Sequence, residues 1–244
     1  MTLIQVTGDY YGTVSGTNQA DEMIISLSMG TQIYGGNGGD SITLLGSTYT
    51  TTDAGNGQDA VYLVGGGFNV VGGANGTDML EALLSLGPVQ LNGGNGADFI
   101  GGSAFADGLS GGNGDDVLFG RAGSDTISGD RGDDAITGGL GNDSLLGGTG
   151  SDSFFYNFAA ISSTAAGIDG RDTIGDFNVH QDHLILHDIL GATDTNHVLL
   201  STVGGDTVIT FDQFVGTDQT ITLLGVTGFA DLQAAMDAGW LLFA

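Results

Sequence analysis

A nine-residue unit that recurs seven times without a gap between Gly93 and Phe155 constrains this chain more than any other feature. The units read GGNGADFIG, GSAFADGLS, GGNGDDVLF, GRAGSDTIS, GDRGDDAIT, GGLGNDSLL and GGTGSDSFF. The eighth position is always large and apolar, at Ile100, Leu109, Leu118, Ile127, Ile136, Leu145 and Phe154. A fixed short period indicates stacked supersecondary units that bury a continuous core only together.

The same unit recurs upstream at about twice this spacing. Gly35–Thr43, Ala54–Tyr62 and Gly73–Glu81 keep the pattern, and Gly16–Ile24 is a degenerate copy in which Gln19 replaces a glycine. Two nonapeptides then form one coil of turn, strand, turn and strand, and successive coils stack at the strand spacing of roughly 4.8 Å. We therefore expect an all-β fold, a right-handed parallel β-roll (β-solenoid), with a β-rich C-terminal cap and a short helix.

Aspartate occupies the sixth position of the units, so stacking predicts aspartate columns. One edge of the roll carries the first column, at Asp21, Asp40, Asp59, Asp78, Asp98, Asp116, Asp134 and Asp152. The opposite edge carries a shorter column, at Asp107, Asp125 and Asp143, and along the first half of the roll we expect plain loop there.

The charge balance explains what these columns need. The chain has 29 acidic residues, three basic ones and a net charge of −26, so stacked carboxylates repel unless cations neutralise them. The oxygen ligands and irregular geometry suit Ca²⁺, whereas zinc and copper prefer His or Cys, and the chain has no cysteine. The same charge excludes nucleic acid and anionic membranes as partners, and no segment is long enough to span a membrane.

Each gap between adjacent turns offers two carboxylates and glycine carbonyls, which gives at most nine calcium sites. The gap between Asp21 and Asp40 is the doubtful one, because of Gln19. Glycine permits the tight, positive-φ turns that this geometry requires. The predicted calcium-site residues are Gly35, Asn37, Asp40, Asn56, Asp59, Asn75, Asp78, Gly93, Asn95, Gly96, Asp98, Asp107, Gly111, Asn113, Gly114, Asp116, Gly120, Gly123, Asp125, Gly129, Gly132, Asp134, Gly138, Gly141, Asp143, Gly147, Gly150 and Asp152.

These units resemble the repeats-in-toxin (RTX) family, whose repeat is G-G-x-G-x-D-x-U-x with U a large apolar residue. The resemblance runs through all seven consecutive units, and Phe105 in the unit Gly102–Ser110 departs from the pattern by replacing a glycine. It implies that the turns bind calcium, that the roll folds on calcium binding, and that a type I secretion apparatus exports the protein by an uncleaved C-terminal signal. The implied location is extracellular, secreted or associated with the surface of a bacterial cell.

We divide the chain into an N-terminal cap with a degenerate repeat (1–34), the roll (35–155) and a C-terminal flank (156–244). In the flank, Asp172, Asp176 and Asp182 resemble the segment that follows many RTX rolls, and one of them could complete the last calcium shell. Further expected elements are strands at Gly205–Phe211 and Thr220–Leu224, which cap the roll, and a helix at Gly228–Gly239. The apolar tail Trp240–Ala244 is either an export signal or a packed cap strand.

Other candidate sites are weaker. The run Leu184–Leu186 alternates like a strand, so the rings of His180, His183 and His187 should not converge, and we expect a solvated loop rather than a transition-metal site. The segment Gly108–Gly112 (GLSGG) satisfies a nucleophile-elbow pattern but lies in a repeat strand. Only some 15 residues precede the first repeat copy, too few for a catalytic domain, so we expect no enzyme activity.

The third repeat position forms an asparagine ladder, at Asn18, Asn37, Asn56, Asn75, Asn95 and Asn113. We interpret it as turn residues whose amides stack, the alternative being a surface for polysaccharide or ice. Two classes of function remain. One is a structural protein folded by calcium, such as a matrix component, a surface-layer subunit or an adhesion factor. The other is an accessory module of a secreted enzyme system that modifies polysaccharides or hydrolyses its substrates. Self-assembly on calcium addition distinguishes the first.

Overall fold

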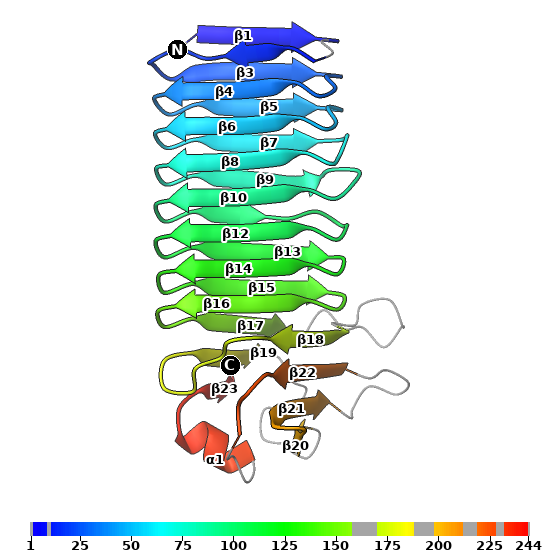
Figure 1. The fold of residues 1–244 in the computed structure, drawn as a ribbon, viewed down its shortest axis with the longest axis vertical. Coiled ribbons are helices and arrows are strands. Elements are labelled where there is room, and N and C mark those ends of the chain that lie inside the picture. The colour runs from blue at the N-terminus through cyan, green and yellow to red at the C-terminus, as the bar shows by residue number, and fades with distance from the viewer. Residues whose placement is uncertain are drawn as a thin grey trace.

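The computed structural model describes residues 2–8, 11–157, 170–187, 198–211, 219–227 and 232–243. The chain winds into a parallel β-roll with two long sheets facing each other across one core (Figure 1). The first, 11-stranded sheet contains β1 (Thr2–Thr7), β3 (Asp21–Ser26), β5 (Ser41–Leu45), β7 (Ala60–Val64), β9 (Met79–Leu84), β11 (Phe99–Gly101), β13 (Val117–Ala122), β15 (Ala135–Leu140), β17 (Ser153–Asn157), β19 (His183–His187) and β23 (Leu241–Phe243).

The second, 12-stranded sheet is parallel except at its C-terminal end. It contains β2 (Thr13–Ser15), β4 (Gln32–Asn37), β6 (Thr51–Asn56), β8 (Val70–Asn75), β10 (Gln90–Asn95), β12 (Gly108–Asn113), β14 (Thr126–Arg131), β16 (Ser144–Thr149), β18 (Arg171–Ile174), β22 (Gln219–Leu223), β21 (Asp206–Phe211) and β20 (Val198–Val203). The only helix in the described residues is α1 (Leu232–Asp237).

The repeat period sets the register. Leu118 pairs with Ile100 on one side and Ile136 on the other, so eighth-position residues stack directly above one another. Ile100, Leu118, Ile136 and Phe154 lie in the first sheet, and their side chains are fully buried between the sheets. The predicted core and the all-β parallel roll are therefore confirmed.

The roll includes more of the chain than the repeats. Parallel pairing already begins with β1 against β3, inside the segment 1–34 that we expected to act as a cap. At the other end, β18 pairs with β16 and β19 with β17, so the stacking continues after the nonapeptide period stops.

The C-terminal strands close this end. β22 pairs with β18, and β20, β21 and β22 form an antiparallel group, in agreement with the strands expected at Gly205–Phe211 and Thr220–Leu224. α1 is shorter than the helix expected at Gly228–Gly239, of which 228–231 lie outside the described residues. Gly239 follows it with φ +83° and donates its N–H to the carbonyl of Met236.

The tail packs as a strand. β23 pairs with β19, and Trp240 and Leu241 are each 1% exposed. This is the packed cap strand of the two alternatives, while the export signal stays a prediction. No helix in the described part of the chain is long and apolar enough to cross a membrane.

Candidate calcium sites of the roll

The first aspartate column lies where each turn enters a strand of the first sheet. The backbone N–H of each aspartate donates to Oδ1 of the aspartate one coil further on, at 2.7–3.0 Å. The ladder runs without interruption from Asp21 to Asp152 and then on to Asp182. The predicted column is confirmed, and the flank extends it.

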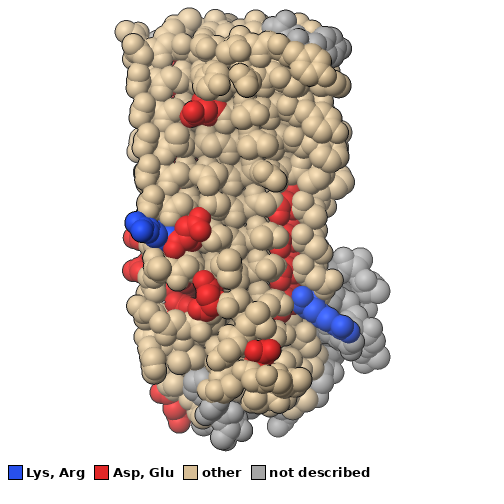
Figure 2. All heavy atoms as spheres, viewed as in Figure 1, with Lys and Arg blue, Asp and Glu red and all other residues tan. Residues whose placement is uncertain are grey.

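The second column lies on the opposite edge and follows the same rule. Asp107 donates to Asp125, Asp125 to Asp143 and Asp143 to Asp172, at 2.8–2.9 Å. Figure 2 shows a line of acidic atoms in the lower half of the molecule toward one edge, and few cationic atoms on this face. Of the flanking acids, Asp172 and Asp182 continue the columns, and Asp176 accepts from the backbone N–H groups of Gly147 and Gly148.

The first half of this second edge is not the plain loop that we expected. Buried Ser, Thr and Asn side chains take the place of aspartate in the turns. Thr50 donates its backbone N–H to Asn69 Oδ1 at 3.0 Å, and Asn69 Nδ2 donates to the carbonyl of Ser47 at 3.0 Å. Neutral side chains thus satisfy the buried turn there without a carboxylate, which corrects the sequence expectation.

One oxygen of most column aspartates has no protein partner. The aspartates are 1–3% exposed, and Oδ1 is used in the ladder, whereas Oδ2 is buried without a hydrogen bond. A buried carboxylate oxygen without a partner carries a large desolvation cost. The residues concerned are Asp40, Asp59, Asp78, Asp98, Asp116, Asp134 and Asp152 in the first column and Asp125 and Asp143 in the second.

The first glycine of each unit faces this free oxygen. A Cβ added to Gly93 would strike Asp98 Oδ2 and would lie 2.6 Å from the carbonyl oxygen of Gly111, one coil further on. The same relation holds for Gly129 with Asp134 and the carbonyl of Gly147, also 2.6 Å from the added atom. Each turn therefore holds a space in which a carboxylate oxygen and a carbonyl oxygen meet, and only glycine leaves it open.

The carboxylates are electrostatically unfavourable as anions in this arrangement. Burial raises the pKa of Asp59, Asp78, Asp116 and Asp152 to about 6, and charged neighbours add to the effect. Burial likewise raises the pKa of Asp125 and Asp134 to about 7, with further repulsion from the adjacent aspartates of the same columns. At neutral pH the folded roll therefore gains from a cation that binds the ionised form.

The ligand set fits a hard cation. Buried Oδ2 atoms and turn carbonyls are oxygen donors of the kind that Ca²⁺ takes in flexible shells. Within the described residues no group of three or more His, Cys, Asp or Glu side chains gathers as a metal-binding cluster. A calcium ion here would therefore depend on backbone carbonyls as much as on the aspartates, and each ion would link consecutive coils.

Three positions of the columns differ from the rest. Asp21 accepts from the backbone N–H groups of Thr2 and Thr17, so both its oxygens are used. Although burial raises the pKa of Asp21, these hydrogen bonds outweigh it and the pKa is lowered. Asp182 closes the other end and accepts from Asn178. In the gap between Asp21 and Asp40, Asp21 therefore has no unbonded oxygen to offer a calcium ion, and this gap stays the doubtful site.

Asp107 is the third exception. Its Oδ1 accepts from the N–H of Val89 at 2.9 Å and from the hydroxyl of Ser103, while its Oδ2 accepts from the N–H of Ser103. Arg121 lies nearby, donates to the carbonyl of Gly102, and pairs with Glu81 at 2.5 Å. Burial raises the pKa of Asp107, and its hydrogen bonds and the positive charge of Arg121 offset only part of this effect. The structure thus supplies this turn with protein donors and a cationic side chain.

The asparagine ladder has a structural role. Each Nδ2 donates to Oδ1 of the preceding asparagine at 2.7–3.0 Å, from Asn113 back to Asn18. The amide-stacking interpretation is confirmed. These side chains are exposed and bond to one another, so the structure does not bring them together with the aspartate oxygens of the predicted sites.

The predicted glycines divide into two groups. The first-position glycines Gly35, Gly93, Gly111, Gly120, Gly129, Gly138 and Gly147 face the free carboxylate oxygens. The fourth-position glycines Gly96, Gly114, Gly123, Gly132, Gly141 and Gly150 have φ between +130° and +141° and contact the turn of the preceding coil. The second group shapes the turn, and the first lets the carboxylate oxygen approach the backbone.

Comparison with known proteins agrees with this geometry. The RTX calcium-binding nonapeptide repeat matches the chain in four overlapping copies, at 92–127, 102–136, 110–145 and 119–154. The chain belongs to the RTX family. As an RTX protein it carries calcium-binding repeats. No curated protein matches it significantly.

Solved structures provide three further likenesses. The AlgE6R2 subunit of the Azotobacter vinelandii mannuronan C5-epimerase is 30% identical, with 59% of this chain and 91% of that chain covered and a TM-score of 0.44. The AlgE6R3 subunit of the same epimerase is 28% identical, with 57% and 79% covered and a TM-score of 0.39. The extracellular lipase LipA of Serratia marcescens is 18% identical, with 84% of this chain but only 40% of that chain covered and a TM-score of 0.37.

The remaining candidates lie away from the columns. The strand expected at Leu184–Leu186 is confirmed as part of β19, whose two ends are His183 and His187. The expected solvated loop is therefore wrong for these two residues, and only His180 lies exposed in the preceding turn. Ser110 lies within β12, and its hydroxyl donates to Asp130 at 2.6 Å. The strand–elbow–helix setting of a nucleophile is therefore not found at Ser110.

Proposed function

We propose that this RTX protein is secreted and folds on binding calcium outside the cell, where it has a structural role in a matrix, a surface layer or adhesion. The observation that carries the proposal is the set of nine buried Oδ2 atoms without protein partners, aligned along both edges of the roll. Without a divalent cation these groups oppose folding at neutral pH, and with one they hold the coils together.

The proposed mechanism is a folding switch. At low free calcium the carboxylates repel, and the chain stays expanded and suited to passage through an export channel. Outside the cell, calcium at about millimolar concentration meets sites of the kind whose dissociation constants are about 10⁻⁴–10⁻³ M in extracellular modules, and binding to the folded state alone stabilises it. Adjacent ions bind to shared turns, so we expect cooperative binding.

We also propose that the chain is not an enzyme and that its C-terminal segment is read by a type I secretion apparatus. Trp240 and Leu241 are buried in the folded roll, so an export signal there would be accessible only before folding. This order agrees with a switch in which calcium acts after export.

Two measurements test this function. The first compares export of the full chain with export of a chain lacking about the last 50 residues. Retention of the shortened chain inside the cell supports the export step, and normal export contradicts it. The second follows the purified protein by light scattering as calcium is added. Ordered assemblies support a structural role, whereas a monomer that co-purifies with a polysaccharide-modifying enzyme favours the accessory-module alternative.

A further inference from the structure

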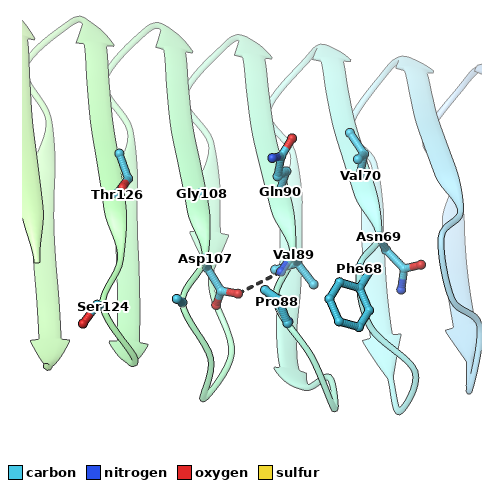
Figure 3. Close-up of a pocket in the computed structure, with 11 residues that line it drawn as sticks. Phe68, Asn69, Val70, Pro88, Val89, Gln90, Asp107, Gly108, Ser124 and Thr126 are labelled. Atoms are coloured by element: carbon cyan, nitrogen blue, oxygen red, sulfur yellow. Dashed lines mark hydrogen bonds between the residues drawn. The ribbon is translucent and has the colours of Figure 1, made fainter.

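The outer face of the second sheet carries a groove between its first and second halves. The groove has a volume of about 640 Å³ and adjoins a hollow of about 310 Å³, and both are lined by Val70, Gln90, Gly108 and Thr126. These four residues stand in register on β8, β10, β12 and β14. Gly108 has no side chain, and Figure 3 shows the opening that it leaves between the side chains of Gln90 and Thr126.

An aromatic side chain forms one wall of this groove. Phe68 is 52% exposed and stacks on Tyr49, itself 60% exposed, with ring centroids 5.1 Å apart and planes at 9°. Pro88 lies beside Phe68 in the wall (Figure 3). Gly87 leaves room for the ring, because a Cβ there would lie only 3.3 Å from it.

The turn itself does not need these rings. Tyr49 has φ +53° and Phe68 φ +58°, a left-handed conformation that disfavours bulky residues. Gly30 occupies the equivalent place one coil before Tyr49, with φ +66°, so glycine serves this turn without strain. Backbone strain that keeps large aromatic rings exposed to solvent indicates a functional surface.

The rest of the lining limits the class of ligand. Gln90, Ser124 and Thr126 present exposed amide and hydroxyl groups, and none of the described residues that line the groove is cationic. Among these described lining residues Asp107 alone is charged, and it is 4% exposed and already bonded to Val89 and Ser103. Together with a net charge of −26, this disfavours anionic ligands.

A neutral saccharide matches this lining. A sugar ring has a C–H face that can lie against an aromatic ring and a rim of hydroxyls that can bond to amide and hydroxyl groups. We propose that this groove binds a neutral oligosaccharide or polysaccharide segment, with one sugar ring against Phe68 and its hydroxyls toward Gln90 and Thr126. The hollow beyond Gly108 continues the path along the sheet, so the occupant is a chain rather than a single sugar.

The variants are chosen so that the fold survives. Phe68→Gly removes the ring and relieves the positive φ, and Gly108→Leu fills the groove from a position where a Cβ meets only Gln90 Cγ, at 3.7 Å. Leu27→Gly is the matched control. Leu27 is 65% exposed with φ +54° on the same edge, but it does not line the groove.

Isothermal titration calorimetry of the full chain in millimolar calcium tests the proposal with cellohexaose, laminarihexaose, mannohexaose and, as an acidic probe, a guluronate hexamer. We expect at least one neutral hexasaccharide to bind. Affinity should fall at least tenfold in Phe68→Gly and in Gly108→Leu, stay unchanged in Leu27→Gly, and be absent for the acidic probe.

Several results overturn this inference: no neutral probe binds, the acidic probe binds equally well, or the variants bind like the parent. A further contradicting result is a dimer by sedimentation that Phe68→Gly dissociates without any sugar binding, because a second copy would then be the occupant. The inference rests on the calcium-folded roll, so circular dichroism of each variant is recorded first. Failure to fold with calcium contradicts the proposed function, whereas a folded chain that binds no sugar contradicts only the groove.

Discussion

The backbone N–H of Asp116 donates to Oδ1 of Asp134 across one coil of the roll, at 2.8 Å. The other oxygen of Asp134 is buried without a hydrogen bond and faces Gly129. One carboxylate thus has two separable roles, a neutral one in joining coils and a charged one in binding a cation.

Asp134→Asn should keep the first role and lose the second. The amide oxygen of the new side chain can still accept from the N–H of Asp116. The pKa of the Asp134 carboxyl is raised to about 7, so at pH 8 it is mostly ionised, and removing this charge should stabilise the calcium-free roll. Calcium should bind more weakly, with a higher midpoint in a titration followed by circular dichroism. Asp134→Ala is the comparison, because it loses the hydrogen bond from Asp116 as well as the charge, at a further cost of about 0.5–1.5 kcal/mol. Equal midpoints for Asp134→Asn and the parent chain would show that this carboxylate does not bind calcium.

The calcium-free chain should fold better in acid than at neutral pH. The folded pKa values of Asp125 and Asp134 are about 7, and those of Asp59 and Asp116 about 6, all above the ordinary value of 3.8. Protonation therefore favours the folded state, and this contribution is fully present below pH 3.8 and is lost as pH rises through 6 to 7. Circular dichroism in chelator between pH 5 and pH 8 should show loss of β-structure with increasing pH. With calcium present the trend should reverse, since protons then compete with the ion. Calcium-free stability that is flat across this range would contradict the desolvated columns.

Filling the space beside a free carboxylate should block a site. Gly111→Ala puts a methyl group against Asp116 Oδ2 and 2.7 Å from the carbonyl of Gly129, and overpacking of this kind costs about 1–3 kcal/mol. Gly72→Ala is the matched control, because its added Cβ has nothing closer than the carbonyl of Thr52 at 3.9 Å. Thermal denaturation in calcium should show a lower melting temperature for Gly111→Ala only. Similar losses in both variants would mean that any extra methyl group in the sheet is harmful and that the space is not special.

Asp107 should not count among the calcium ligands. Ser103 and Val89 use both its oxygens, and Arg121 stands nearby as a fixed positive charge. Native mass spectrometry should therefore find as many calcium ions in Asp107→Asn as in the parent chain, and fewer in Asp125→Asn. A loss of equal size in both variants would restore Asp107 to the predicted ligand set.

The sequence predicts the repeating part of this molecule well and its exceptions poorly. A nine-residue period with an apolar eighth position determines strand, register and core together, and it places Asp98 above Asp116 without any knowledge of tertiary structure. The turns outside this period are harder to predict, because serine, threonine, asparagine or aspartate can each satisfy the buried backbone N–H groups of the same turn. Nothing in the spacing indicates that Asn69 stands in for an aspartate, or that Ser103 satisfies Asp107.

The continuation of the roll into the C-terminal flank also depends on contacts that are distant in sequence. Asp182 takes its place in the column 30 residues after Asp152, where no period announces it. The acidic residues of the flank suggest a link to the last turn, but their spacing does not distinguish Asp182, which extends the first column, from Asp176, which accepts from the backbone of Gly147 and Gly148 in the last turn of the same column.

Far-UV circular dichroism of the purified chain during a calcium titration, with magnesium as the control, tests the central claim most directly. Buried carboxylate oxygens without protein partners predict a cooperative change from coil to β-structure near millimolar calcium, with no such change in magnesium. A fully folded roll in excess chelator at neutral pH would contradict the account, because the aspartate columns would then be stable without a cation.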